Sequence, residues 1–116
     1  MELNKAVEII MKARGAFLSG GEIWVLKDSI GATPVKLFTK EQALSECIDL
    51  NVLANLWHSF PNDWSVQFWE NGNVVEILTN NDNDDFYKGE GINAATFATA
   101  EALKSMTENS NDKIST

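Results

Sequence analysis

The first apolar pattern in the chain has the period of a helix. Apolar side chains recur three and four positions apart from Leu3 to Met11, and charged side chains occupy the positions between them. Gly15 follows Arg14, a combination that suits a helix C-terminus because glycine accepts a left-handed cap and arginine complements the helix dipole. The pattern therefore predicts a helix that begins near Leu3 and ends before Gly15.

Two short apolar runs follow, and each predicts a strand. The run Ile23–Leu26 comes after a break at 19–21 and has the continuous apolar character of a buried strand. The run 35–38 comes after a loop over 28–34 and ends where Thr39 can begin a helix.

A capping box marks the start of the next helical segment. Thr39 is followed three positions later by Gln42, the spacing at which each side chain accepts a hydrogen bond from the backbone amide of the other residue. Apolar positions then continue to Phe60, and Pro61 disfavours helix at the residue before it. The pattern fits either one long helix or two shorter helices broken near 49–51.

A hairpin centred on Asn71-Gly72 is the strongest short-range signal. Asn-Gly supplies the two positive-φ residues of a type I′ turn, so we predict a two-residue turn between strands over 64–70 and 73–79. The predicted partners across the hairpin are Trp69 with Val74, Phe68 with Val75, and Val66 with Ile77. The face expected to meet the core carries Val66, Phe68, Val75 and Ile77. The opposite, mixed face carries Gln67, Trp69, Val74, Glu76 and Leu78.

The remaining segments complete an α+β fold. We expect a polar loop over 80–91, a final helix from Thr96 or Thr99 to Met106, and a frayed tail over 107–116. Two pairs of strands separated by helices predict a single domain over 1–106, with a mainly antiparallel sheet of about four strands and helices packed on it.

Composition excludes several classes of protein. The chain has 116 residues, of which 44% are hydrophobic and 22% are charged, values typical of globular domains. No apolar run approaches the about 20 residues of a membrane span, and no apolar stretch near the first residue resembles a signal peptide. The single cysteine, Cys47, cannot form an internal disulfide. We therefore expect a cytoplasmic protein that does not associate with membranes.

Acidic residues are concentrated in the second part of the chain. The net charge is −8, but residues 1–40 hold six basic and four acidic residues, whereas residues 41–116 hold three lysines and thirteen acidic residues. Nine acids and no base lie between Lys40 and Lys88: Glu41, Glu46, Asp49, Asp63, Glu70, Glu76, Asp82, Asp84 and Asp85. Such a surface repels nucleic acid and attracts basic proteins, although acidity also serves solubility alone. We expect no direct binding to nucleic acid.

No set of residues in the sequence indicates catalysis or a metal site. His58 is the only histidine and has no catalytic motif around it. Cys47 lies on an apolar helical face beside Glu46 and Asp49, so we predict a buried and unreactive thiol. The acid-rich segment 80–90 fails the EF-hand pattern in both registers that begin in it. We therefore predict a non-enzymatic protein with no metal and no cofactor.

Aromatic side chains surrounded by acids are typical of a contact with a basic protein. We predict an acidic binding protein, an inhibitor or regulator of the type found among phage and plasmid accessory proteins. Its expected partner is a basic protein surface, for example that of a nucleic-acid-binding protein. The predicted partner-binding residues are Trp69, Glu70, Glu76, Asp82, Asp84, Asp85 and Tyr87.

Three alternatives stay open at this point. The chain could be a homo-oligomeric assembly module, such as a homodimer, whose acidity serves only solubility. It could be a small ligand-binding protein or enzyme with a pocket that no motif reveals. The final helix could also cover the face that carries Trp69, which would place this side chain in the core.

Overall fold

The chain runs through helix, three strands and helix, and then repeats this order. The computed structural model describes residues 1–26, 36–79 and 86–115, with side chains described as far as Thr107. The first set of elements is α1 (Leu3–Ala13), β1 (Ala16–Ser19), β2 (Ile23–Leu26), β3 (Lys36–Thr39) and α2 (Lys40–Cys47). The second set is α3 (Leu50–Trp57), β4 (Ser65–Trp69), the short 3₁₀ turn η1 (Glu70–Gly72), β5 (Val74–Leu78), β6 (Phe86–Glu90) and α4 (Ala94–Ser115).

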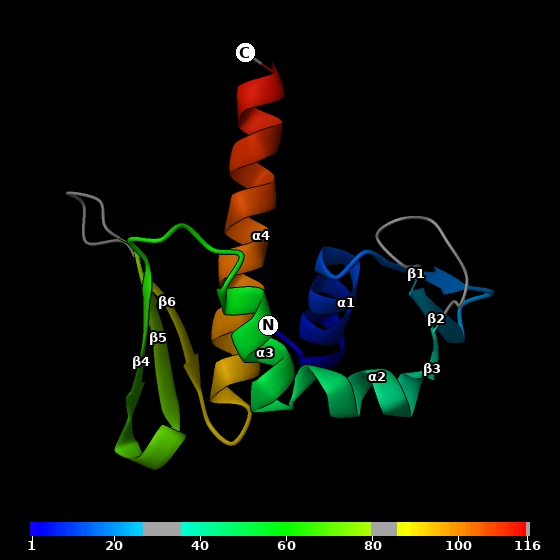
Figure 1. The fold of residues 1–116 in the computed structure, drawn as a ribbon, viewed down its shortest axis with the longest axis horizontal. Helices are drawn as coiled ribbons and strands as arrows, with labels where there is room; N and C mark the ends of the chain where they lie inside the picture. Colours follow the sequence, from blue (N-terminus) through cyan, green and yellow to red (C-terminus); the bar gives the residue numbers. More distant parts are fainter. Residues whose placement is uncertain (27–35, 80–85, 116) are drawn as a thin grey trace.

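The described strands form two antiparallel sheets, with strand orders β1-β2-β3 and β4-β5-β6. The two sheets lie on opposite sides of the molecule, and α4 and α1 stand between them (Figure 1). The predicted α+β class is therefore confirmed. The prediction of one sheet of about four strands is wrong, because each predicted pair of strands gains a third strand, β1 or β6.

Local signals place the helices correctly. Helix α1 ends before Gly15, as its pattern predicts. The capping box at the start of α2 is complete, because the amide of Gln42 donates to Thr39 Oγ1 at 3.1 Å and the amide of Thr39 donates to Gln42 Oε1 at 2.9 Å. The segment that follows is two helices, since the carboxylate of Asp49 accepts from the amide of Asn51 at 2.8 Å and so caps α3.

Helix α4 is the central element, and its first turns are buried on most sides. It begins at Ala94, just before the nearer of its two predicted starts, Thr96. It continues to Ser115, so its predicted end at Met106 is wrong. Most of its buried side chains are alanines, and their small size lets the sheet and the other helices approach closely. These alanines are Ala94, Ala95, Ala98, Ala100 and Ala102. The predicted fraying of residues 107–116 stays a prediction.

Two hydrogen bonds tie α4 to the helices around it. The hydroxyl of Thr96 donates to the carbonyl oxygen of Cys47 at 2.8 Å, and the indole of Trp57 donates to Thr99 Oγ1 at 2.8 Å. Buried polar groups that are satisfied in this way fix the position of the helix without a desolvation penalty. Among the described residues, no helix is long and apolar enough to cross a membrane.

Candidate functional site

The hairpin of β4 and β5 has the predicted register but a longer turn. Trp69 pairs with Val74 and Phe68 with Val75, as expected. Asn71 and Gly72 hold the predicted positive φ values, 57° and 88°. Glu70 also has a positive φ, 52°, so the two-residue turn is wrong: four residues, 70–73, connect the strands. Three consecutive residues of the turn therefore have positive φ values.

The sheet β4-β5-β6 turns one face to the helices and the other away from them. Gly89 lies against α4, and its cross-strand neighbour on the central strand, Val75, is buried on the same side. We call the opposite side the outer face: Ser65, Gln67, Trp69, Val74, Glu76, Leu78, Phe86, Lys88 and Glu90. The outer face exposes 50% of Trp69 and 51% of Phe86. The final helix therefore covers the inner face (Figure 1). Trp69 stays half-exposed on the other face.

Carboxylates outnumber bases on and beside the outer face. Lys88 and Glu90 form an ion pair at 2.9 Å. The pKa of Lys88 is raised, chiefly by its hydrogen bond and charge interaction with Glu90, and further by the charges of Glu76 and Glu70. Three carboxylates thus act on one ammonium group, and the local charge stays negative.

The structure brings together only part of the predicted site. Trp69 and Glu76 share the outer face, and Glu70 lies in the adjoining turn. Tyr87 is on the inner face, opposite Ile77; its hydroxyl hydrogen-bonds with that of Ser105 at 2.7 Å, and its ring contacts Trp64. Its predicted location in a loop is wrong, because 86–90 is strand β6.

Three predicted residues lie outside the described part of the chain: Asp82, Asp84 and Asp85. In the sequence they directly precede Phe86, which lies at one end of the outer face. Any role for these three aspartates stays a prediction.

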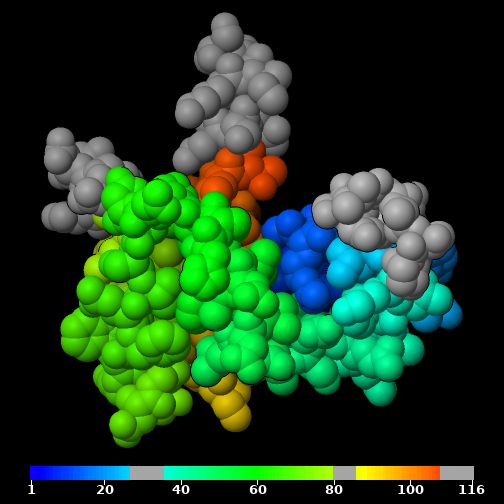
Figure 2. All heavy atoms as spheres, in the orientation of Figure 1, coloured from blue at the N-terminus to red at the C-terminus, as the bar shows by residue number. Residues whose placement is uncertain are grey.

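A second exposed surface lies at the end of the molecule that holds the hairpin turn. A pocket of about 280 Å³ is lined there by four exposed apolar side chains: Ile48, Leu50, Phe68 and Ile92. Ile92 is 95% exposed, and the segment that joins β6 to α4 projects at the lower edge of Figure 2. We call these four residues the turn-end patch.

Sequence patterns alone do not reveal the turn-end patch. Phe68 lies on the predicted core face, but it is 49% exposed on an edge strand. Its ring packs against that of Trp57, with ring centroids 5.9 Å apart. Ile48 and Leu50 come from the junction of α2 and α3, and Ile92 comes from the connection between β6 and α4. Such a cluster forms only when the helices and the sheet pack together.

Of the two residues considered for catalysis in the sequence, Cys47 is buried as predicted. His58 ends α3 and is exposed. Cys47 is fully buried, with its thiol near the carbonyl oxygen of Val7. Within residues 1–26, 36–79 and 86–115, no three or more His, Cys, Asp or Glu side chains are grouped as metal ligands would be.

No protein-family model, curated protein or solved structure matches the chain.

Proposed function

We propose that the protein is a non-enzymatic acidic binding protein that presents its outer face to a basic protein surface. The observation that carries the proposal is an exposed Trp69 on a sheet face where Glu70, Glu76 and Glu90 outweigh Lys88. Val74 and Leu78 lie between the aromatic side chains on the central strand and provide an apolar floor.

The two kinds of side chain contribute differently to such a complex. Trp69 and Phe86 each keep about half of their surface exposed, and burying this surface against a partner supplies affinity. The carboxylates attract a basic partner over a distance of about one Debye length, which raises the association rate more than the affinity. Basic surfaces often bind nucleic acid, so occupying one would make the protein an inhibitor or regulator of phage or plasmid accessory type, acting in the cytoplasm.

The test begins with a pull-down of the full chain at ~50 mM and ~300 mM salt, because steered binding weakens as salt increases. A partner recovered at low salt is then titrated against wild type, Trp69→Ala and Glu76→Lys. We expect a basic partner, about tenfold weaker binding for Trp69→Ala, and a reduced salt dependence for Glu76→Lys. The matched control is Glu22→Lys, which makes the same charge change near the other sheet.

The proposal fails if the partner is not basic, or if both outer-face variants bind like wild type and like Glu22→Lys. It also fails if the chain recovers only itself.

The turn-end patch favours a second candidate function, a homodimeric assembly module. Ile92 is 95% exposed beside a pocket lined by the other three residues of the turn-end patch and by polar residues. A two-fold dimer that buries Ile92 of each copy against the turn-end patch of the other fits this arrangement. Sedimentation of wild type over a wide range of concentration would show a dimer, and Ile92→Lys would abolish it. A monomer at all concentrations would exclude this function.

A further inference from the structure

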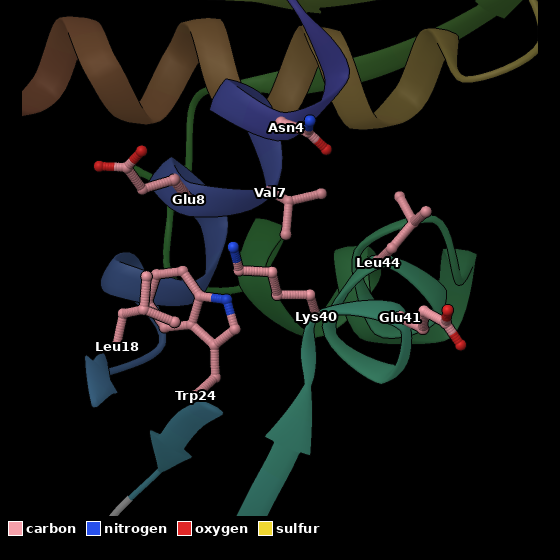
Figure 3. Close-up of a pocket in the computed structure, with 8 residues that line it drawn as sticks. All are labelled: Asn4, Val7, Glu8, Leu18, Trp24, Lys40, Glu41 and Leu44. Carbon is pink, nitrogen blue, oxygen red and sulfur yellow. The ribbon is translucent and has the colours of Figure 1, made fainter. Parts of the chain in front are cut away.

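A pocket lies between α1, the sheet β1-β2-β3 and the start of α2. Its volume is about 350 Å³, within the range of small-molecule sites. Figure 3 shows the side chains around it: Asn4, Val7, Glu8, Leu18, Trp24, Lys40, Glu41 and Leu44. Four apolar or aromatic side chains and four polar or charged ones share its lining.

One polar group in this pocket has no partner within the described part of the protein. Only 4% of the surface of Trp24 is exposed, yet its indole N–H has no hydrogen-bond acceptor among the described residues. Among the described residues, no side-chain nitrogen or oxygen that is closed off from solvent lacks a hydrogen-bond partner. Because the indole nitrogen of Trp24 lacks one, it is not closed off and is open to the pocket. Figure 3 shows this nitrogen on the edge of the ring that faces Lys40. Donors of largely buried side chains are nearly always hydrogen-bonded, so this one indicates an acceptor that enters from the pocket.

The charges on the Trp24 side of the pocket favour an anion. Glu41, one of the two acids in the lining, points away from Trp24 and from the ammonium group of Lys40 (Figure 3). Glu8 is already paired, at 2.8 Å with Lys12 and 3.8 Å with Lys5. Its hydrogen bond to Lys12 lowers the pKa of the Glu8 carboxyl, so this side chain stays ionised and engaged. Lys40 has no ion-pair partner within the described part of the chain, and its ammonium group points toward the indole nitrogen of Trp24 in Figure 3.

We propose that this pocket binds a small organic carboxylate with a compact apolar body. Lys40 and the Trp24 N–H together present two donors to the carboxylate, and Val7, Leu18 and Leu44 contact the apolar part. The ammonium group of Lys40 would repel a cationic ligand. A neutral ligand would form only uncharged hydrogen bonds with Lys40 and Trp24, without the charge attraction that a carboxylate adds. This site is independent of the outer face, which belongs to the other sheet.

The experiment follows the indole N–H resonance of Trp24 in the ¹⁵N-labelled full chain. The probes share a phenyl ring and differ in charge: phenylacetate, phenylacetamide and phenethylamine. We expect phenylacetate to shift the Trp24 resonance downfield, and to do so at concentrations about tenfold lower than either other probe, because hydrogen bonds to charged groups are the stronger ones.

Two variants separate a specific site from general attraction of anions. Lys40→Gln removes an exposed side chain at the start of α2 and should weaken phenylacetate binding about tenfold without unfolding the protein. Lys104→Gln makes the same change on α4, away from the pocket, and should bind like wild type.

The proposal is overturned if no probe shifts the Trp24 resonance at millimolar concentration. It is also overturned if the three probes act equally, or if both lysine variants weaken binding equally.

Discussion

Cys47 shows how burial controls the chemistry of one side chain. Burial in the core is the largest effect that raises the pKa of this thiol, to about 11 from an ordinary 9.0; Arg14 lowers it and Glu46 raises it further. The sequence pattern predicts an unreactive thiol from an apolar helical face and acidic neighbours. The larger contribution to the pKa comes from core packing, which neighbours in the sequence do not determine.

This shift predicts a pH-dependent loss of stability that belongs to Cys47. Between pH 9 and 11 the unfolded thiol loses its proton while the folded thiol keeps it, so the free energy of unfolding falls as pH rises through this range. Urea titrations at several pH values measure this free energy for wild type and for Cys47→Ala. It should fall more steeply with pH for wild type than for Cys47→Ala. Parallel curves would contradict the shift, as would rapid alkylation of native protein at neutral pH.

Glu70 carries backbone strain at the residue scale. Its φ of 52° lies in the left-handed region, where a side chain with a Cβ costs about 1–2 kcal/mol. We expect Glu70→Gly to raise the free energy of unfolding by about 1 kcal/mol, since glycine adopts this conformation without a steric penalty.

The matched control for Glu70→Gly lies in the same turn. Asn73 has a φ of −78°, so Asn73→Gly relieves no strain and should destabilise the protein slightly. Urea denaturation of both variants measures the difference. If Glu70→Gly is no more stable than Asn73→Gly, the turn is not strained at Glu70.

At the scale of elements, strand β6 and helix α4 depend on a glycine where they meet. A Cβ on Gly89 would collide with the carbonyl oxygen of Ala94 and lie 2.7 Å from the amide nitrogen of Ala98. Gly89→Ala must therefore separate the strand from the helix, and we expect it to lower the free energy of unfolding by about 1–3 kcal/mol. Gln67→Ala, on the outer face, should change stability little; equal effects in a urea titration would contradict this close contact.

Elements with a local chemical signal could be predicted from the sequence. The capping box at Thr39 and the spacing in α1 each act within a few residues, and both are confirmed. The Asn-Gly pair lies in the predicted turn with the predicted positive φ values, but the turn has four residues and not two. Strands β1 and β6 lack such a signal. Phe17 and Leu18 are consecutive apolar residues that are both exposed, and the end of β6 is polar, so only pairing with a neighbouring strand makes these segments extended.

Part of the candidate site could likewise be predicted from local sequence signals, and part of it could not. The hairpin register and the alternation of side chains are local properties, and they suffice to assign Trp69 and Glu76 to one face. Tyr87 could not be assigned to a face from its sequence neighbours, because its direction depends on how β6 pairs with β5. The pocket around Trp24 has no local signal either, since its walls come from separate elements brought together by tertiary packing.

At the scale of the whole molecule, the central helices join the two sheets into one structure. Helix α1 packs against the first sheet and against α4, and α4 packs against the second sheet. The buried contact of Cys47 with Val7 and the hydrogen bond from Thr96 to Cys47 link α1, α2 and α4. Neither sheet therefore has a core of its own that could persist without the helices between them.

This arrangement predicts a single cooperative unfolding transition. The four tryptophans report on separate parts: Trp24 on the first sheet, Trp57 on α3, and Trp64 and Trp69 on the second sheet and its approach. Because domains of this size with a shared core unfold in one step, all four indole N–H resonances should lose their native intensity with the same urea midpoint. The measurement needs no substitution and follows both sheets in one sample. If the Trp24 resonance disappeared at a lower urea concentration than the Trp64 resonance, the two sheets would be separate folding units, and the helices between them would be a linker rather than a common core.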